Sequence, residues 1–539
     1  MAQGLAVTFE LLAETRNEAA VAVLIPALDS ADPSIREQAL QAIMRRRSPA
    51  GLRAVLSRLH EWDDRSREII GRYRGRMASV LRDAVVGKDH QLFFNACQAI
   101  VGFREYDLTA ALVTAAEDET NPNADQAAAT IVALAARLYD EVVGPRDYRE
   151  RRDPQLVRQH VVTTLEGSLK RYPQHKRRAV VEAFLLLAGR ENAVLKQILH
   201  DPHHPCYLPV VDVLIHCVQD GIQRLALSFL DDPHAPSAAL SVWAHRRDVA
   251  FVRRLLDKVS GGIHDIMAHN LKRVESIGWL RDNPSLIDQL DDTQQSSLVQ
   301  LVMASGMKRL EAFKTVEYLI CYGTDGGRRT ACAALAEFSG ADANRLAEQA
   351  LDDPNPQVQA AAVGQLRQRG LPGAMTRLIE LVDSPHPAVS AAARAQLSEF
   401  SLERYLAAFD GLDDQVRVST GALVRKVDPE ALPGLAAEMA APARSRRLRA
   451  VAAAQALHAI AELEPSLLTL LIDEDHMVRT EAARALADCD TPTVRAALRE
   501  ALADRSVAVQ LAVKRSLDQL GRSRPTHPVP SAAMTDPTH

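Results

Sequence analysis

The chain has 539 residues, of which 47% are hydrophobic but only 4% aromatic, so its core must be built mainly from aliphatic side chains. This composition favours helices packed on helices over a β-sandwich, whose strands prefer aromatic and β-branched residues. The 64 lysines and arginines are outnumbered by 69 aspartates and glutamates, and the formal charge of −5 excludes a global attraction to nucleic acid or anionic lipid.

The first segment, residues 1–16, is predicted to be a capping helix. Residues 1–10 lack the basic start of a signal peptide, and Glu10 interrupts their short apolar run. No apolar stretch approaches the ~20 residues that span a bilayer, so we expect no membrane insertion. The six cysteines are scattered and form no C-x-x-C pair, which predicts free thiols and a cytoplasmic location.

Helical repeats are predicted over residues 17–143, and their first unit shows a recurring pattern. An acidic turn that contains Asp32 and Pro33 precedes a helix near Ile35. Aspartate accepts hydrogen bonds from the free N–H groups at a helix start, and proline fits the first helical position because no N–H donor is needed there. In a later unit, Asp353 and Pro354 are expected to fill these two positions. Copies of the pattern, some of them partial, stand at residues 199–202, 230–233, 351–358, 382–389, 409–417 and 472–479.

Two segments are rich in basic residues, and the second begins in a charged loop predicted over residues 144–154. Residues 45–82 hold eleven arginines against four acids, and residues 146–178 hold ten basic residues against four acids. Such faces can neutralise phosphates, although a solvated face or a patch for an acidic protein would have the same composition. The candidate binding residues are Arg65, Arg67, Arg72, Arg74, Arg76, Arg149, Arg151, Arg152, Lys176, Arg177 and Arg178.

The middle of the chain, residues 155–340, is predicted to form more degenerate helical repeats. It contains a weak candidate for a zinc site, because imidazole and thiolate ligands stand close together in the sequence. These ligands are His200, His203, His204 and Cys206. Histidine also occupies the turn position of His203 in other units, at His234, His386 and His476. The repeat pattern therefore accounts for the histidines, and we predict no metal.

The repeat is most regular over residues 341–521. The apolar residue that opens each second helix recurs in steps of 31, 27, 32, 30 and 31 residues, at Val358, Val389, Val416, Leu448, Val478 and Val509. Further apolar residues follow at offsets +4 and +8, as in Val358, Ala362 and Leu366, and these lie on one face of a helix. The same offsets hold for the helices that open at Ile35, Val389 and Val478. A single helix pair cannot bury both of its faces, so the pairs must stack.

The period of 27–32 residues, the Asp-Pro turns and the Val-Arg pairs at residues 416–417 and 478–479 resemble HEAT repeats, and most closely the short subtype first associated with phycobilisome lyases. The resemblance covers residues 341–521 and 17–47, and more loosely 190–247. It implies an all-α solenoid, a right-handed superhelix of stacked antiparallel helix pairs of the HEAT or armadillo kind, with a concave surface used for binding. It also implies that arginines following the opening residue pair with acids of neighbouring turns, and these arginines are Arg36, Arg417, Arg449 and Arg479.

No motif for catalysis stands out. The sequence lacks the glycine-rich phosphate loops and the G-x-S-x-G nucleophile turn. HEAT-like deoxyhypusine hydroxylases hold iron through several His-Glu dipeptides, and this chain has one, at residues 60–61.

We therefore predict a non-catalytic scaffold or adaptor, without a cofactor, that binds a protein or peptide along the concave surface. Nucleic-acid binding through residues 45–82 and 146–178 is the first alternative, and a bilin-lyase-like enzyme, by repeat analogy only, is the second. Residues 522–539 contain four prolines and little apolar content, so they are predicted to be disordered. The sequence leaves the oligomeric state open.

Overall fold

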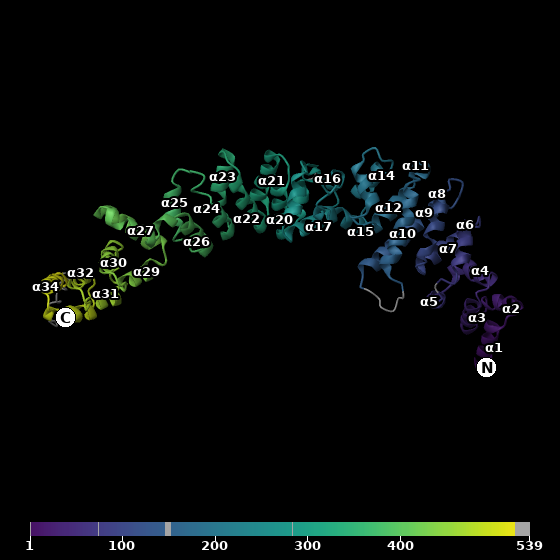
Figure 1. Ribbon diagram of the computed structural model, residues 1–539, viewed down its shortest axis with the longest axis horizontal. Coiled ribbons are helices and arrows are strands. Elements are labelled where there is room, and N and C mark those ends of the chain that lie inside the picture. The colour runs from purple at the N-terminus through teal and green to yellow at the C-terminus, as the bar shows by residue number, and fades with distance from the viewer. Residues whose placement is uncertain (1, 74, 146–151, 283, 523–539) are drawn as a thin grey trace, which may run out of the picture. The chain divides into compact units, whose positions relative to one another are not determined.

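The computed structural model describes residues 2–73, 75–145, 152–282 and 284–522, and none of these residues lies in a β-strand. The chain divides into two compact units, Met1–Thr315 and Val316–His539, each built from successive helix pairs (Figure 1). The predicted all-α solenoid is confirmed. The division differs from the predicted domain boundaries, which follow the regularity of the repeats and stay predictions. From residue 523 onward, the predicted tail lies outside the described residues.

In the first unit, most second helices of consecutive pairs stack on one another, for example α12 on α9 and on α14. The elements of this unit are α1 (Ala2–Glu14), α2 (Ala19–Ala27), α3 (Pro33–Arg46), α4 (Pro49–Ser57), η1 (Leu59–Glu61), α5 (Asp64–Gly71), α6 (Ala78–Val86), α7 (His90–Gly102), η2 (Tyr106–Leu108), α8 (Thr109–Glu117), α9 (Ala124–Val143), α10 (Pro154–Leu169), α11 (Tyr172–His175), α12 (Arg178–Leu187), α13 (Ala193–His200), α14 (Tyr207–His216), α15 (Asp220–Ser228), η3 (Phe229–Asp231), α16 (Ser237–His245), α17 (Val249–Ser260), α18 (Asp265–Lys272), α19 (Gly278–Asp282), η4 (Pro284–Gln289) and α20 (Asp292–Ala304).

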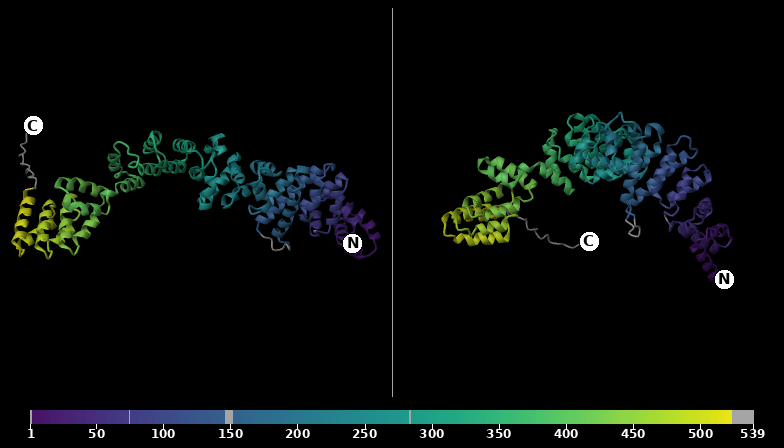
Figure 2. Two further views of the ribbon diagram at one scale, coloured as in Figure 1. Left: turned by 45° about the horizontal axis from the view of Figure 1, so that its top comes forward. Right: turned by 45° about the vertical axis from the view of Figure 1, so that its right-hand side comes forward.

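In the second unit, coloured from teal-green to yellow in Figure 2, α24 packs between α22 and α26, and α32 packs between α30 and α34. The elements are α21 (Arg309–Tyr322), which begins before the boundary, α22 (Asp325–Ala334), η5 (Leu335–Glu337), α23 (Ala341–Ala350), α24 (Pro356–Val363), α25 (Ala374–Leu381), α26 (Pro387–Gln396), η6 (Ser398–Phe400), α27 (Leu402–Ala408), η7 (Phe409–Gly411), α28 (Asp414–Val427), α29 (Ala431–Met439), α30 (Arg444–Ala456), α31 (Glu464–Leu470), α32 (His476–Ala485), η8 (Leu486–Asp488), α33 (Pro492–Glu500), η9 (Ala501–Ala503) and α34 (Val507–Arg522).

Helix starts follow the predicted chemistry, with one correction of position. Asp32 caps α3 by accepting a hydrogen bond of 2.8 Å from the backbone N–H of Ser34. In α24, however, the cap is Asn355 and the first helical residue is Pro356, so the assignment of Asp353 to the cap was wrong by two residues. Asp353 instead accepts a hydrogen bond from the N–H of Asn355 and so shapes the turn before the helix.

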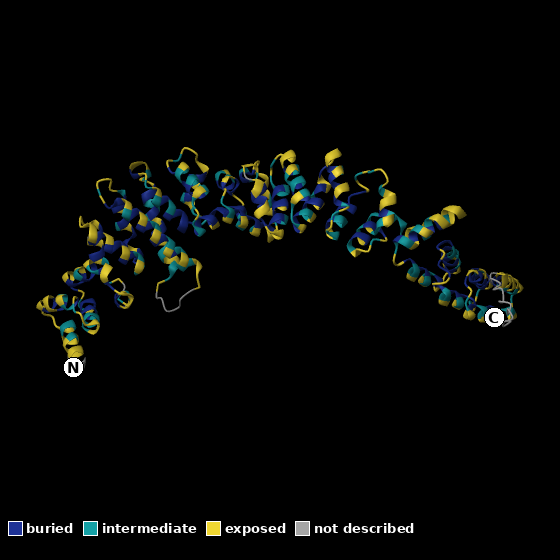
Figure 3. Cartoon of the chain, turned by 180° about the vertical axis from the view of Figure 1, so that it is seen from behind, coloured by how far each residue is buried: buried dark blue, intermediate teal, exposed yellow. Residues whose placement is uncertain are grey.

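The predicted apolar stripe is buried in most second helices, where it lies between stacked pairs (Figure 3). Val358, Ala362 and Leu366 are at most 2% exposed, and the stripes that open at Val389 and Val478 are fully buried.

Two opening residues were assigned wrongly. Val416 is 39% exposed and belongs to none of the core clusters of the second unit. Leu448 is only half-buried, and in its helix α30 the buried arginine is Arg447 instead of Arg449. The register of α30 is therefore shifted by two residues, and Ala450 and Ala454 lie in its core.

Candidate functional site

The predicted basic residues of α5 and its surroundings are mostly engaged within the chain. Arg65 pairs with Glu37 of α3 at 2.7 Å, and Arg72 pairs with Glu68 one helical turn away at 2.8 Å. Arg76 donates to the backbone oxygen of Met44 at 3.0 Å, and its guanidinium lies 4.6 Å from the ring centroid of Tyr73. The predicted residue Arg74 lies outside the described residues.

The second basic segment is also engaged, and its ion pairs join successive helix pairs. Arg152 pairs with Asp107 at 3.0 Å, Arg177 with Asp125 at 2.6 Å, and Arg178 with Asp212 at 2.5 Å. Lys176, which caps the C-terminal end of α11 in a left-handed backbone conformation, is exposed. The predicted residues Arg149 and Arg151 lie outside the described residues. These arginines therefore balance nearby acids, which reduces the positive charge that they offer to a phosphate backbone.

One predicted residue, Arg67, differs from the others because it borders a hollow and has no partner among the described residues. The hollow has a volume of about 850 Å³ and lies between α5 and α7. Its lining residues are Leu59, Arg67, Glu68, Gly71, Arg72, Gln98, Ala99, Gly102 and Phe103. We name this feature the α5–α7 hollow.

The hollow exists because α7 stacks on α4 and is not packed closely on α5 in the described part of the chain. The buried amide of Asn95 in α7 donates to the backbone oxygens of Leu56 and Ser57, at 2.9 and 3.1 Å, and so fastens α7 to the end of α4. The two facing helices end at Gly71 and Gly102, which have no side chains to fill the gap. A Cβ atom added to Gly102 would meet nothing within 4 Å.

The α5–α7 hollow combines an apolar floor with a charged rim. Leu59 and Ala99 are 3% and 1% exposed, and Phe103 is half-buried. On the rim, the hydrogen bond from Arg72 lowers the pKa of Glu68, so this pair is fully ionised at neutral pH. Arg67 adds an exposed, unpaired guanidinium, which can donate two parallel hydrogen bonds to a carboxylate.

Sequence reasoning named Arg67 and Arg72 but missed the remaining lining residues. The local signal that could have found the hollow is the glycine at the end of each facing helix, Gly71 and Gly102.

The weak metal candidate does not gather into a ligand set. Cys206 is buried, and its thiol donates to the backbone oxygen of Leu169 at 3.4 Å. Burial raises the pKa of this thiol to about 11, so it is protonated at neutral pH. The ring nitrogen Nδ1 of His204 accepts from the N–H of Cys206 instead of facing its sulfur. No group of three or more His, Cys, Asp or Glu side chains that could hold a metal occurs among the described residues, His200 and His203 included.

A buried cluster of Ser168, His175 and Glu117 has the residue types of a catalytic triad, and sequence reasoning did not single it out. Its hydrogen bonds do not fit nucleophilic catalysis. The hydroxyl of Ser168 donates to Glu117 at 2.5 Å, while His175 Nδ1 accepts from the N–H of Arg177 at 3.0 Å. In the neutral ring the proton is then on Nε2, which lies 3.1 Å from the backbone oxygen of Ser168. His175 therefore has no free nitrogen to accept the serine proton, and the cluster joins α8, α10 and α11.

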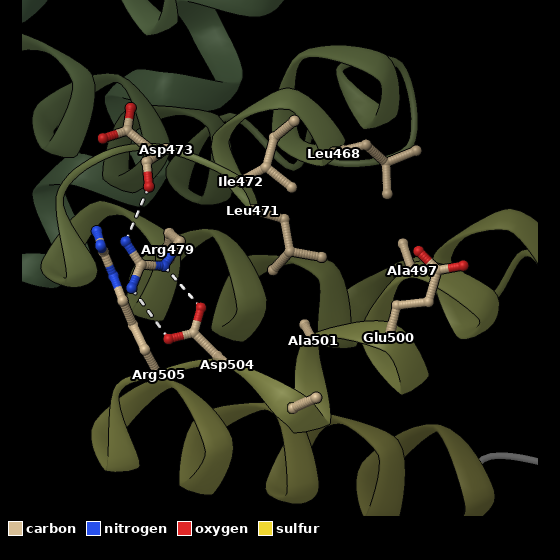
Figure 4. Close-up of a pocket in the computed structure, with 11 residues that line it drawn as sticks. Leu468, Leu471, Ile472, Asp473, Arg479, Ala497, Glu500, Ala501, Asp504 and Arg505 are labelled. Atoms are coloured by element: carbon tan, nitrogen blue, oxygen red, sulfur yellow. Dashed lines mark hydrogen bonds and ion pairs between the residues drawn. The ribbon is translucent and has the colours of Figure 1, made fainter.

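A second hollow, of about 450 Å³, lies between the last two helix pairs of the second unit (Figure 4). Arg479 of α32 crosses one end of it and is only 5% exposed. Its Nε and Nη2 donate to the two carboxylate oxygens of Asp504 at 2.8 and 3.0 Å, and its Nη1 donates to the backbone oxygen of Asp473 at 2.8 Å. All its donor atoms are thus used within the chain, in agreement with the structural role expected for it.

Comparison with known proteins supports the fold. The family described as HEAT repeats matches residues 324–414. The fold is a HEAT-repeat α-solenoid. No curated protein matches the sequence.

Among solved structures, an engineered protein is 15% identical over 93% of this chain and 98% of its own, with a TM-score of 0.18. A structure from work on a phosphorylation switch between cadherin and β-catenin is 14% identical, over 97% and 96%, with a TM-score of 0.23. Kap121p bound to Pho4p is 10% identical, over 97% and 73%, with a TM-score of 0.26. At these scores the likenesses carry no argument about function. Within the part of the chain that the structure describes, no helix is both long and apolar enough to cross a membrane.

Proposed function

We propose that this chain is a non-catalytic scaffold that binds a partner protein, and that the α5–α7 hollow is one of its contact points. The observation that supports it is the hollow itself, where an apolar floor and an unpaired arginine lie between α5 and α7. Repeat solenoids bind through the long faces that their stacked helices form. A volume of about 850 Å³ is within the range of ligand pockets and admits a large side chain of a partner.

The test is a comparison of bound proteins between matched variants. Gly102→Leu adds an apolar side chain to the lining of the hollow, and the Cβ atom of that side chain has open space around it. Arg82→Glu, on the exposed side of α6 and away from the hollow, is the control. We expect proteins that crosslink to the unaltered chain and to the Arg82→Glu variant to be lost from the Gly102→Leu variant. Equal recovery of every partner by all three forms would contradict the proposed contact point.

The two alternatives have less support. Arg65, Arg72, Arg152, Arg177 and Arg178 pair with acids of the chain, so nucleic-acid binding would have to break these pairs or use other residues. Bilin-lyase activity, and the short phycobilisome-lyase subtype itself, rest only on the repeat pattern, that is, on its period of 27–32 residues, its Asp-Pro turns and its Val-Arg pairs. The cytoplasm remains our proposal for its location, supported by six free cysteines.

A further inference from the structure

We infer that the partner segment that enters the α5–α7 hollow is an acidic peptide that carries one large apolar side chain. This inference rests on the proposed function and names the chemistry of its partner. It follows from three properties of the hollow: the charge of its rim, the apolar character of its floor, and its exposure to solvent along α5.

The rim attracts carboxylates. Arg67 and Arg72 carry positive charge and Glu68 carries negative charge, so the lining residues have a net charge of +1 (two cations less one anion). Glu68 already has its partner in Arg72, at 2.8 Å, whereas Arg67, with five N–H donors, has no side-chain partner among the described residues. A carboxylate that meets Arg67 gains charge-assisted hydrogen bonds without breaking a pair inside the chain.

The floor requires an apolar side chain. Leu59, Ala99 and Phe103 line it, and the only polar, uncharged lining side chain is Gln98. A purely acidic segment would leave this apolar surface wet, so it would gain affinity from the rim alone. Burying one aromatic or large aliphatic side chain against the floor adds favourable transfer free energy that the rim alone does not supply.

The surroundings favour a peptide over a compact small molecule. On α7, one helix face carries Phe94, Gln98 and Gly102 at intervals of four residues. It extends the surface of the hollow to Phe94, which is 37% exposed. The rim side chains of Glu68 and Arg72 are each 66% exposed, so the hollow is open to solvent along α5. An extended segment can place its anchor in the hollow and its flanking carboxylates along these edges.

The experiment selects peptides from a phage-displayed library of random dodecapeptides on the full-length chain, with counter-selection on the Gly102→Leu variant. We expect the enriched peptides to have a net negative charge and at least one Phe, Tyr, Trp, Leu or Met. The strongest of them is then synthesised with a fluorescent label, and its affinity is measured by fluorescence anisotropy. Circular dichroism and the thermal unfolding midpoint establish that each variant is folded.

Variants separate the two contributions. Arg67→Glu should weaken binding about tenfold or more, since a hydrogen bond to a charged group is replaced by repulsion. Gly102→Leu should abolish binding, and Arg82→Glu should leave it within about twofold. Replacing the apolar residue of the peptide by Ser should weaken binding about tenfold. This loss is smaller than expected for the complete burial of a large side chain, because the hollow is open to solvent along α5.

Several results would overturn the inference. Enrichment of basic or neutral peptides would do so, and so would an Arg67→Glu variant that binds the selected peptide as well as the unaltered chain. Binding of a fluorescent 20-nucleotide single strand that requires Arg67 would assign the rim to nucleic acid instead. If crosslinked partners still depend on Gly102 while the selected peptides are not acidic, the proposed function stands and the inference fails. If the crosslinked partners do not depend on Gly102 and the counter-selection leaves no enriched peptide, both fail.

Discussion

Two hollows at the same place in the repeat differ in how their arginine is used. The hollow of the second unit contains Arg479, whose guanidinium is paired with Asp504, 25 residues later (Figure 4). The first unit has a hollow of similar volume, about 470 Å³, around Arg36. Each arginine is the fourth residue after its helix cap, and each donates to backbone oxygens of the turn before its own helix, so the local structure is the same.

The difference lies in the next repeat. Arg36 donates to the backbone oxygens of Ser30 and Ala31, at 2.8 and 3.2 Å, but no carboxylate lies within ion-pair distance of it among the described residues. Arg447 and Arg328, by contrast, pair with Asp473 and Asp353. The repeat pattern thus places the arginine, whereas an aspartate about 25 residues later decides whether the seam between two repeats is closed. We call a seam with this ion pair closed and one without it open.

The largest effect is expected from breaking the closed seam at Arg479. In Arg479→Ala, the carboxylate of Asp504, whose side chain is 12% exposed, loses its partner, and two backbone oxygens lose their donor. Removing one partner of a buried pair costs about 3–5 kcal/mol. Because stability is shared between neighbours, α33 and α34 should open while the rest of the unit stays folded. Hydrogen exchange of α34 measures this opening.

Arg484→Ala on the same helix is the matched control. Arg484 pairs with Glu481 at 2.6 Å, but the two side chains are 56% and 39% exposed, so its loss should cost less than about 0.5 kcal/mol. Equal exchange rates in the two variants would contradict the role given to the closed seam.

The second-largest effect is expected from acid, which should open the closed seam. The hydrogen bonds from Arg479 hold the pKa of Asp504 below its ordinary value of 3.8. A carboxyl group whose pKa is lowered by folding contributes stability above its unfolded pKa, and this contribution is lost as the pH falls through the folded value. The unaltered chain should therefore lose stability in its last repeats below about pH 4.

Asp504→Asn isolates this titration, because the amide keeps the size of the side chain but carries no charge. Urea unfolding of α34, monitored by hydrogen exchange, should show that the variant is less stable than the unaltered chain at pH 6 and that this difference shrinks below pH 4. A difference that stays constant down to pH 2.5 would assign the loss to packing instead of charge.

Sequence reasoning reached the local parts of this comparison and stopped at the tertiary ones. Turn, cap and stripe are set by neighbouring residues, so the stripe that opens at Val478 and the structural role of Arg479 could be predicted. Partners in other helix pairs could not be predicted, as for Arg65, which pairs with Glu37. The α5–α7 hollow depends on α7 stacking on α4 through Asn95, which no local pattern encodes.

The open seam should tolerate the loss of its arginine. In Arg36→Ala, two hydrogen bonds to turn oxygens are lost, one part-buried and one exposed, but no carboxylate is left without a partner. The expected cost is about 1 kcal/mol, well below that of Arg479→Ala. Urea unfolding monitored by tryptophan fluorescence measures this cost, because one of the three tryptophans, Trp62, is buried beside the hollow around Arg36. A cost equal to that at Arg479 would remove the distinction between open and closed seams.

The smallest effect, and the sharpest test, is to close the open seam. Glu61 follows Arg36 by 25 residues, as Asp504 follows Arg479. Glu61 lines the hollow around Arg36, but its carboxylate lies 3.5 Å from Nε2 of His60 and its side chain is 65% exposed. Glu61→Asp puts the residue type of the closed seams at this position, and pairing with Arg36 should stabilise the unit by about 0.5–1 kcal/mol.

The gain in stability from Glu61→Asp must disappear when Arg36 is absent. A double-mutant cycle of Glu61→Asp with Arg36→Ala, measured by urea unfolding, gives the interaction free energy between the two side chains. We expect a favourable coupling of about 0.5 kcal/mol or more, because the shorter side chain is the one that reaches the arginine in the closed seams. A coupling of zero would mean that the position of η1 and α5 keeps the seam open and that no single carboxylate can close it. These two elements also line the α5–α7 hollow.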